Sequence, residues 1–238
     1  MLSLDGQIAL VTGAAGGIGR AIALALARQG ATLCLVGRTR ESLEGVASEI
    51  GSGRAHVCAC DLADDSQLTA LPGLVERHAG AVDIVVHSAA AYFQEPLETA
   101  PVEEFDVQYR ISLRAPYLLT QKLLPQLKRR RGQVVFINSS TGVNARAGVT
   151  QYAAVKHGLK GLADAFRLEI APVGVRVISV YPGQTATPMQ ERRHRIEGKR
   201  YEPGKLIQPD DVASAVLNAV TMPRTAQATD VHVRPFGT

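Results

Sequence analysis

The sequence predicts a three-layer α/β fold, in which a doubly wound parallel sheet of about seven strands is covered by helices on both faces. Short, nearly continuous apolar runs alternate with longer segments of helical periodicity along the whole chain, and such runs are typical of parallel strands buried on both faces. Hydrophobic residues make up 46% of the 238 residues and Trp is absent. We therefore expect an aliphatic core within one domain over residues 1–238.

Each element is bounded by its hydrophobic pattern and by Gly or Pro. In the first half, strands are expected at 7–12, 32–36, 55–60 and 82–87, and helices at 17–29, 41–50 and 64–78, the last of them broken near Pro72. In the second half, helices are expected at 102–111, 115–130, 152–171 and 209–220, and strands at 133–139, 175–180 and 230–233.

Charge and composition narrow the classes of function. The formal net charge of +4 permits anionic ligands, but the basic residues are not interleaved with aromatics, so we expect no nucleic-acid partner. The start shows no signal peptide, and no stretch approaches the ~20 apolar residues of a membrane span. Cys34, Cys58 and Cys60 lack disulfide or metal spacing and are expected to be small buried side chains. We expect a cytoplasmic protein without a metal site or a membrane partner.

A glycine-rich turn follows the first predicted strand and leads into a helix. It reads Thr-Gly-Ala-Ala-Gly-Gly-Ile-Gly over 12–19. Gly13, Gly17 and Gly19 let the backbone turn sharply and approach a diphosphate, which the amides and dipole of the helix N-terminus favour. An ordinary tight turn is the alternative. The flanking strand and helix favour a nucleotide site, although the spacing differs from the Gly-x-Gly-x-x-Gly of many dinucleotide folds.

Three polar residues beyond the fifth predicted strand form a candidate catalytic group. Tyr152 and Lys156 stand four apart at the start of a predicted helix, so their side chains share one face. A cation beside a phenol favours the phenolate, so we expect Lys156 to lower the pKa of Tyr152 below its usual value of about 10. Ser139 precedes the helix across a loop and is able to hold a substrate oxygen. The trio suits proton transfer at an alcohol or carbonyl oxygen, although Tyr-x-x-x-Lys alone also occurs by chance.

Taken together, these motifs resemble the short-chain dehydrogenase/reductase family over nearly the whole chain. The resemblance is carried by 12–19, Asp61, Ser139, the pair Tyr152 and Lys156, and Pro182-Gly183 followed by Thr187. It implies a Rossmann-like fold, a nicotinamide cofactor, and hydride transfer to or from a carbonyl or alcohol carbon. It further implies that Tyr152 is the proton donor or acceptor, that Lys156 lowers its pKa and holds the nicotinamide ribose, and that Ser139 positions the reacting oxygen.

The resemblance also predicts a set of cofactor contacts at the ends of several strands. In addition to Tyr152 and Lys156, these are Gly13, Ala15, Gly17, Ile18, Gly19, Arg38, Asp61, Leu62, Ser88, Ala89, Ala90, Pro182, Gly183, Thr185 and Thr187. Asp61 and Leu62 are expected near the adenine, with capping of the next helix as the alternative role of Asp61. Thr187 is expected at the nicotinamide carboxamide.

The residue after the second predicted strand indicates which nicotinamide dinucleotide is bound. A carboxylate there would hold the adenosine ribose hydroxyls and repel a 2′-phosphate. This chain has Arg38 instead, and a guanidinium makes charge-assisted hydrogen bonds to phosphate. The sequence therefore predicts NADP(H) over NAD(H), with a solvated loop arginine as the alternative.

Two departures from the family pattern bear on activity. The family usually has Asn-Asn-Ala-Gly after the fourth strand, whereas this chain has His87-Ser88-Ala89-Ala90. We expect His87 to be a satisfied buried imidazole, and Ala90 to be tolerated if its φ is negative. Ser112 stands where the family usually places an Asn that helps a water chain reach the catalytic lysine. Because a serine still holds a water, we retain Ser112 as a catalytic candidate.

The substrate is left open by the sequence. Residues 185–208 are expected to form a mobile lid, and their basic residues suggest an anionic substrate, with a solvated basic helix as the alternative. The main hypothesis is an NADP(H)-dependent oxidoreductase for a small-molecule carbonyl/alcohol pair. A 3-oxoacyl-thioester reductase and a cofactor-binding, non-catalytic regulatory protein are the alternatives. The resemblance also suggests a homotetramer or homodimer.

Overall fold

The computed structural model describes residues 4–51 and 53–236 as an alternating series of strands and helices. The strands are β1 (Ile8–Thr12), β2 (Thr32–Gly37), β3 (Ala55–Ala59), β4 (Ile84–His87), β5 (Gln133–Ile137), β6 (Arg176–Pro182) and β7 (Asp230–Val233). The α-helices are α1 (Gly17–Arg28), α2 (Arg40–Ile50), α3 (Asp65–His78), α4 (Val102–Tyr109), α5 (Ala115–Arg130), α6 (Thr150–Ile170), α7 (Pro188–Ile196) and α8 (Pro209–Val220).

The strands form one parallel sheet in the order β3-β2-β1-β4-β5-β6-β7. The chain runs outward from β1 through β2 to β3, then crosses to the other side of β1 and continues from β4 to β7. Such a doubly wound sheet has its ligand crevice at the carboxyl ends of the strands, where the order reverses. Here that point lies between β1 and β4. The predicted Rossmann-like fold is confirmed.

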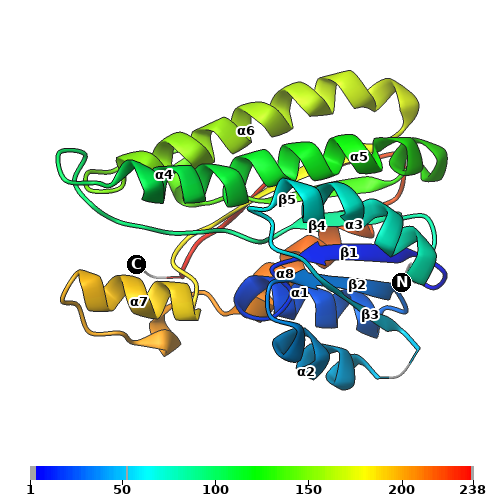
Figure 1. Cartoon of the computed structure of the whole chain (residues 1–238), viewed down its shortest axis with the longest axis horizontal. Coiled ribbons are helices and arrows are strands. Elements are labelled where there is room, and N and C mark those ends of the chain that lie inside the picture. Colours follow the sequence, from blue (N-terminus) through cyan, green and yellow to red (C-terminus); the bar gives the residue numbers. More distant parts are fainter. Residues whose placement is uncertain (1–3, 52, 237–238) are drawn as a thin grey trace.

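Helices cover both faces of the sheet (Figure 1). Helices α1, α2 and α8 pack one hydrophobic cluster against it, and α3, α5 and α6 pack a second cluster on the opposite face. Successive side chains along the inner strands pack into the two clusters in turn: Val135 lies in the first cluster and Phe136 in the second. The three cysteines are free and buried, as predicted. No helix in the described ranges has the length and apolar character needed to cross a membrane.

Two local features differ from the sequence prediction, and a third agrees with the basic helix that was the stated alternative for residues 185–208. Helix α3 continues through Pro72. The proline removes one backbone hydrogen bond, but the buried side chains of Leu68, Leu71 and Val75 anchor the helix on both sides of it. The predicted gap between 111 and 115 is a π-helical turn that joins α4 to α5 without a break. Part of the predicted lid is helix α7, which begins with Thr187 as its N-cap and Pro188 at its first position.

Candidate active site

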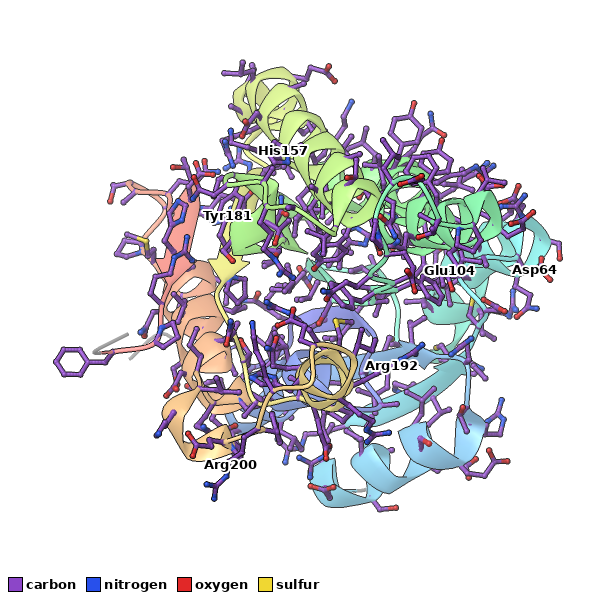
Figure 2. All side chains as sticks on the ribbon, turned by 90° about the vertical axis from the view of Figure 1, so that its left-hand side faces the viewer. Asp64, Glu104, His157, Tyr181, Arg192 and Arg200 are labelled. Atoms are coloured by element: carbon purple, nitrogen blue, oxygen red, sulfur yellow. The ribbon has the colours of Figure 1, made fainter. Side chains whose placement is uncertain are left out.

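The residues singled out from the sequence lie beyond the carboxyl ends of six neighbouring strands. The glycine turn follows β1, Arg38 follows β2, Asp61 follows β3, the segment 88–90 follows β4, and Ser139 follows β5; Gly183, Thr185 and Thr187 follow β6. Because all strands are parallel, these segments meet at one edge of the sheet. Figure 2 looks toward this edge, with α7 in front of it.

The glycine turn is packed too tightly for side chains at two positions. A Cβ on Gly13 would lie 2.9 Å from the backbone of Ala89, and φ at Gly13 is +68°. A Cβ on Gly19 would overlap the carbonyl oxygen of Gly13. Gly17 has φ of +51° and faces the methyl group of Thr187. This cradle of bare backbone at the start of α1 fits the diphosphate of a dinucleotide.

Thr12 fastens the glycine turn to the loop after β4. Its Oγ1 accepts hydrogen bonds from the amides of Ser88 and Ala89, each at 3.1 Å, and donates to the Val86 carbonyl oxygen at 3.4 Å. Ala90 has no positive φ, since Arg131 is the one non-glycine residue with positive φ in the described ranges. The alanine that departs from the family pattern is therefore accommodated without backbone strain.

Arg38 is exposed directly after β2 and makes no ion pair or hydrogen bond to any described side chain or backbone group. Its neighbour Arg40 pairs with Glu44 at 3.7 Å.

Asp61 accepts a hydrogen bond from the Ala63 amide at 2.9 Å, whereas Asp64 caps α3 by accepting from the amides of Ser66 and Gln67. The alternative interpretation of Asp61 as the helix cap is therefore wrong. Leu62 is buried in the core.

The candidate catalytic residues meet between β5 and α6. Ser139 and Tyr152 line one pocket, and Lys156 lies buried one helical turn beyond Tyr152. The Lys156 ammonium donates to the Ile137 carbonyl oxygen at 3.1 Å and lies 5.7 Å from the centroid of the Tyr152 ring. Asn138 donates to the Lys156 carbonyl oxygen at 3.2 Å and so ties α6 to the end of β5. The Tyr152 phenol and the Ser139 hydroxyl group are therefore held at the same pocket.

Burial changes the ionisation of both members of the Tyr152 and Lys156 pair. Removal from water raises the pKa of Tyr152 to about 12, and the opposing effects of Ser139, Arg193 and Arg146 do not reverse this. Burial lowers the pKa of Lys156 to about 8. The Tyr152 pKa is therefore raised, against the expectation that Lys156 lowers it, because desolvation of the phenolate is the largest effect on this pKa. At neutral pH, Tyr152 is a neutral acid.

Ser112 lies in the π-helical turn and is buried. Its Oγ accepts a hydrogen bond from the Ala91 amide at 3.1 Å, so it holds the loop after β4.

His87 is also buried and contacts Thr120 Oγ1 through Nε2 at 2.8 Å, with its ring stacked on Phe136. Burial lowers the pKa of His87 to about 3. The expected neutral, hydrogen-bonded imidazole is confirmed.

One pocket of about 110 Å³ collects only part of the predicted set. Ile18, Ser139, Tyr152, Pro182, Gly183, Thr185 and Thr187 line it. The other predicted cofactor residues, together with Lys156 and Ser112, lie outside this lining. Tyr92 and Arg193 also line the pocket, and sequence reasoning had placed them in the loop 91–98 beside the substrate and in the basic lid. It did not single out Asn138 or Arg146, which line the pocket as well. The place of Asn138 at the end of β5 was an available signal, whereas Arg146 lies in a loop without a sequence pattern.

A glycine-lined turn at the reversal point of a doubly wound parallel sheet defines an α/β dinucleotide-binding protein. A family model described as short chain dehydrogenase matches residues 7–197. An uncharacterized oxidoreductase of Staphylococcus aureus (strain USA300) is 30% identical over 99% of this chain and 100% of that protein. The chain belongs to the short-chain dehydrogenases and is an oxidoreductase of that family.

Solved structures of the same fold contain both kinds of nicotinamide dinucleotide. A metagenomic short-chain oxidoreductase in complex with NADP is 34% identical, with a TM-score of 0.85 over 98% of this chain and 99% of that chain. The 3-ketoacyl-(acyl-carrier-protein) reductase of Brucella melitensis, complexed with NADH, is 28% identical, with a TM-score of 0.86 over 97% of this chain and 98% of that chain.

Gly19→Ala should weaken binding of the nicotinamide dinucleotide by about tenfold or more, because the methyl group and the Gly13 carbonyl oxygen cannot occupy the same space and the turn must move. Fluorescence titration with NADPH measures the effect. Gly45→Ala on α2 is the control, since a Cβ there meets no atom within 4 Å. An affinity within twofold of the parent protein would contradict the tight-cradle interpretation.

Proposed function

We propose that this protein is an NADP(H)-dependent oxidoreductase that interconverts a carbonyl and a secondary alcohol, with Tyr152 as the acid/base. The observation that carries the proposal is that Ser139 and Tyr152 line one pocket at the carboxyl edge of the sheet, with the Lys156 ammonium buried behind them. This edge also carries the glycine cradle. A proton donor and a cofactor site therefore share one crevice.

The protonation states favour carbonyl reduction at neutral pH. The raised pKa keeps Tyr152 protonated, so its hydroxyl donates a proton to the oxygen of the substrate. Ser139 Oγ accepts the Thr141 amide hydrogen at 3.1 Å and is hydrogen-bonded to Tyr152, so the two hydroxyl groups are placed to bond to the same substrate oxygen. When bound, the nicotinamide supplies the hydride for the carbonyl carbon. In the reverse direction, Tyr152 takes the alcohol proton.

Residues at the strand ends would hold the cofactor. The diphosphate would lie over the bare backbone of Gly13, Gly17 and Gly19, and Ile18 and Thr187 line the pocket beyond it. The free guanidinium of Arg38 would pair with a 2′-phosphate, which supports NADP(H). The NADP complex of the metagenomic oxidoreductase agrees with this preference, whereas the NADH complex of the Brucella reductase keeps NAD(H) as an outcome of the test.

Residues 185–208 would act as a lid over the substrate. The α7 residues Met189, Gln190 and Arg193 line the pocket, while α7 itself has no buried residue. A helix without buried side chains is suited to move when substrate enters.

Ser112 would act on the other side of the site. It would keep the loop after β4 in place and, as predicted, hold a water near the catalytic lysine.

A 3-oxoacyl-thioester reductase remains the second enzymatic candidate, because the Brucella neighbour carries that name. By the family resemblance, reductases of that kind commonly have an arginine just before the glycine of the turn that enters the sixth strand. This chain has Val173-Gly174 there, which weakens this candidate.

Tyr152→Phe should abolish nearly all turnover while cofactor binding persists, because the variant loses the proton donor and keeps the ring. A panel of ketones, aldehydes and an acetoacetyl thioester with NADPH, followed at the nicotinamide absorbance, measures this. Binding of NADPH without turnover of any compound by the parent protein would favour the non-catalytic regulatory alternative. Activity in the phenylalanine variant within tenfold of the parent would remove Tyr152 from the mechanism.

The rate should depend on pH through Lys156, since its ammonium is the charged group behind the phenol and would bind the ribose. With a pKa of about 8, Lys156 is charged below that pH and neutral above it. The value of kcat/KM for NADPH reports groups of the free enzyme. It should be level near neutral pH and fall as pH rises through about 8. A profile that stays level until Tyr152 ionises near pH 12 would show that the ammonium is not required.

Arg38→Ala should raise the KM for NADPH by about tenfold or more and leave the KM for NADH nearly unchanged, because only NADPH offers a phosphate to this guanidinium. Steady-state kinetics with both cofactors test the difference. Arg77→Ala, an exposed arginine in the last turn of α3, is the matched control. Equal changes for the two cofactors would refute the assignment of Arg38 to a 2′-phosphate.

A further inference from the structure

The basic residues of the lid do not all face the same way. Arg195 is exposed, and Arg200 points into solvent with 87% of its side chain exposed (Figure 2). Arg192 lies over the Phe93 ring at 5.9 Å. Only Arg193 lines the pocket that contains Ser139 and Tyr152, and its side chain is 15% exposed. One positive charge of the lid is therefore directed at the reacting end of the substrate site.

A second arginine reaches the same pocket from the loop after β5. Arg146 lines the pocket and shares Oε1 of Glu197 with Arg193, at 3.4 and 2.8 Å respectively. Lys199 pairs with the other carboxylate oxygen at 2.8 Å. Three cations thus surround one carboxylate and leave an excess of two positive charges. None of the residues that line the pocket is Asp or Glu.

The donors of these arginines are only partly used within the protein. Arg193 binds Glu197 through Nε, and its two terminal nitrogens have no acceptor among the described residues. Arg146 donates through Nη2 to the Tyr92 hydroxyl at 3.0 Å. The Tyr92 ring packs edge-on against the Tyr152 ring, with centroids 4.9 Å apart. The two free nitrogens of Arg193 thus belong to a guanidinium that lines the same pocket as Tyr152 and acts on its hydroxyl electrostatically.

We propose that Arg193 and Arg146 form a carboxylate-binding site, so that the substrate is a compact oxo acid and the product its hydroxy acid. This inference rests on the proposed function and adds the substrate class to it. A guanidinium with two free nitrogens binds a carboxylate through two parallel hydrogen bonds. Glu197 is itself neutralised by its three partners, so its charge does not exclude a second carboxylate.

The pocket dimensions favour a small acid. A volume of about 110 Å³ is well below the roughly 300–1,000 Å³ of pockets that hold drug-sized ligands. Arg193 and Arg146 line this one pocket together with Tyr152, so a short carbon chain would join the carboxylate to the carbonyl group. The substrate of this site therefore has its charge a few bonds from the reacting carbon.

The experiment compares oxo acids with their uncharged methyl esters. The pairs are 3-oxobutanoate and 4-oxopentanoate, each with its methyl ester, reduced with NADPH. The parent enzyme should have a higher kcat/KM for each acid than for its ester. Arg193→Gln should lower kcat/KM for the acids by about tenfold or more, mainly through KM, and change the values for the esters by less than about threefold.

Arg195→Gln is the matched control, because it removes the same charge from the same helix at an exposed position outside the pocket. Its kinetic constants should equal those of the parent. An equal loss for acids and esters in Arg193→Gln would assign Arg193 to lid structure alone and overturn the proposal. A parallel weakening of NADPH binding, measured by fluorescence, would identify the cofactor diphosphate as the anion and would also overturn it.

A binding measurement separates this proposal from the proposed reaction. Isothermal titration calorimetry of 4-oxopentanoate into the NADP+ complex measures binding without turnover, because the oxidised cofactor has no hydride to give to the carbonyl carbon. If no carbonyl compound is reduced but the acid binds the parent and not Arg193→Gln, the carboxylate site stands and the proposed reaction fails. If the acid does not bind the parent complex, the carboxylate site is overturned whatever the enzyme reduces.

Discussion

The close approach of the ends of β1 and β4 determines the geometry of the whole site. Thr12 holds two amides of the loop after β4 at 3.1 Å, and Gly13 touches the backbone of Ala89 with no room for a side chain. These two strands are the ones between which the direction of winding reverses, so the crevice opens there. The contact joins the glycine cradle after β1 to the loop after β4, which contributes Tyr92 to the substrate pocket.

On the side of the site formed by β5 and α6, the structure depends on polar side chains whose burial lowers the stability of the fold. Lys156 is 2% exposed and bonds to the end of β5 through its ammonium, and Asn138 bonds back to the helix that carries it. Burying a lysine disfavours its charge and lowers its pKa. An apolar residue would stabilise the core more, so the lysine indicates a chemical requirement. The same dry environment raises the Tyr152 pKa and makes the phenol a proton donor.

How much the sequence predicts depends on whether the signal is local. The strands and helices carry local hydrophobic periodicity, and their order predicted the fold. Tyr152 and Lys156 are one turn apart, so their adjacency was predictable as well. The direction of the Tyr152 pKa shift was not, because helical spacing reveals a neighbouring cation but not desolvation. Helix α7 was predicted only as the alternative to a mobile lid, because it buries no apolar face that would fix its position from the sequence. Arg146 meets Glu197 across 51 positions of sequence, and no local pattern indicates such a contact.

Glu197 explains how two arginines remain together at the mouth of a partly dry pocket. Without a counter-charge they would repel each other and draw the lid away. Burial alone would raise the pKa of Glu197, but hydrogen bonds from Lys199 and Arg193 bring it down to about 2, so the carboxylate stays ionised and holds the lid to the loop after β5. Tyr92 links the same cluster to the loop after β4. Segments from α7, the loop after β5 and the loop after β4 thus converge on one charge cluster, which is the site that we propose for the substrate carboxylate.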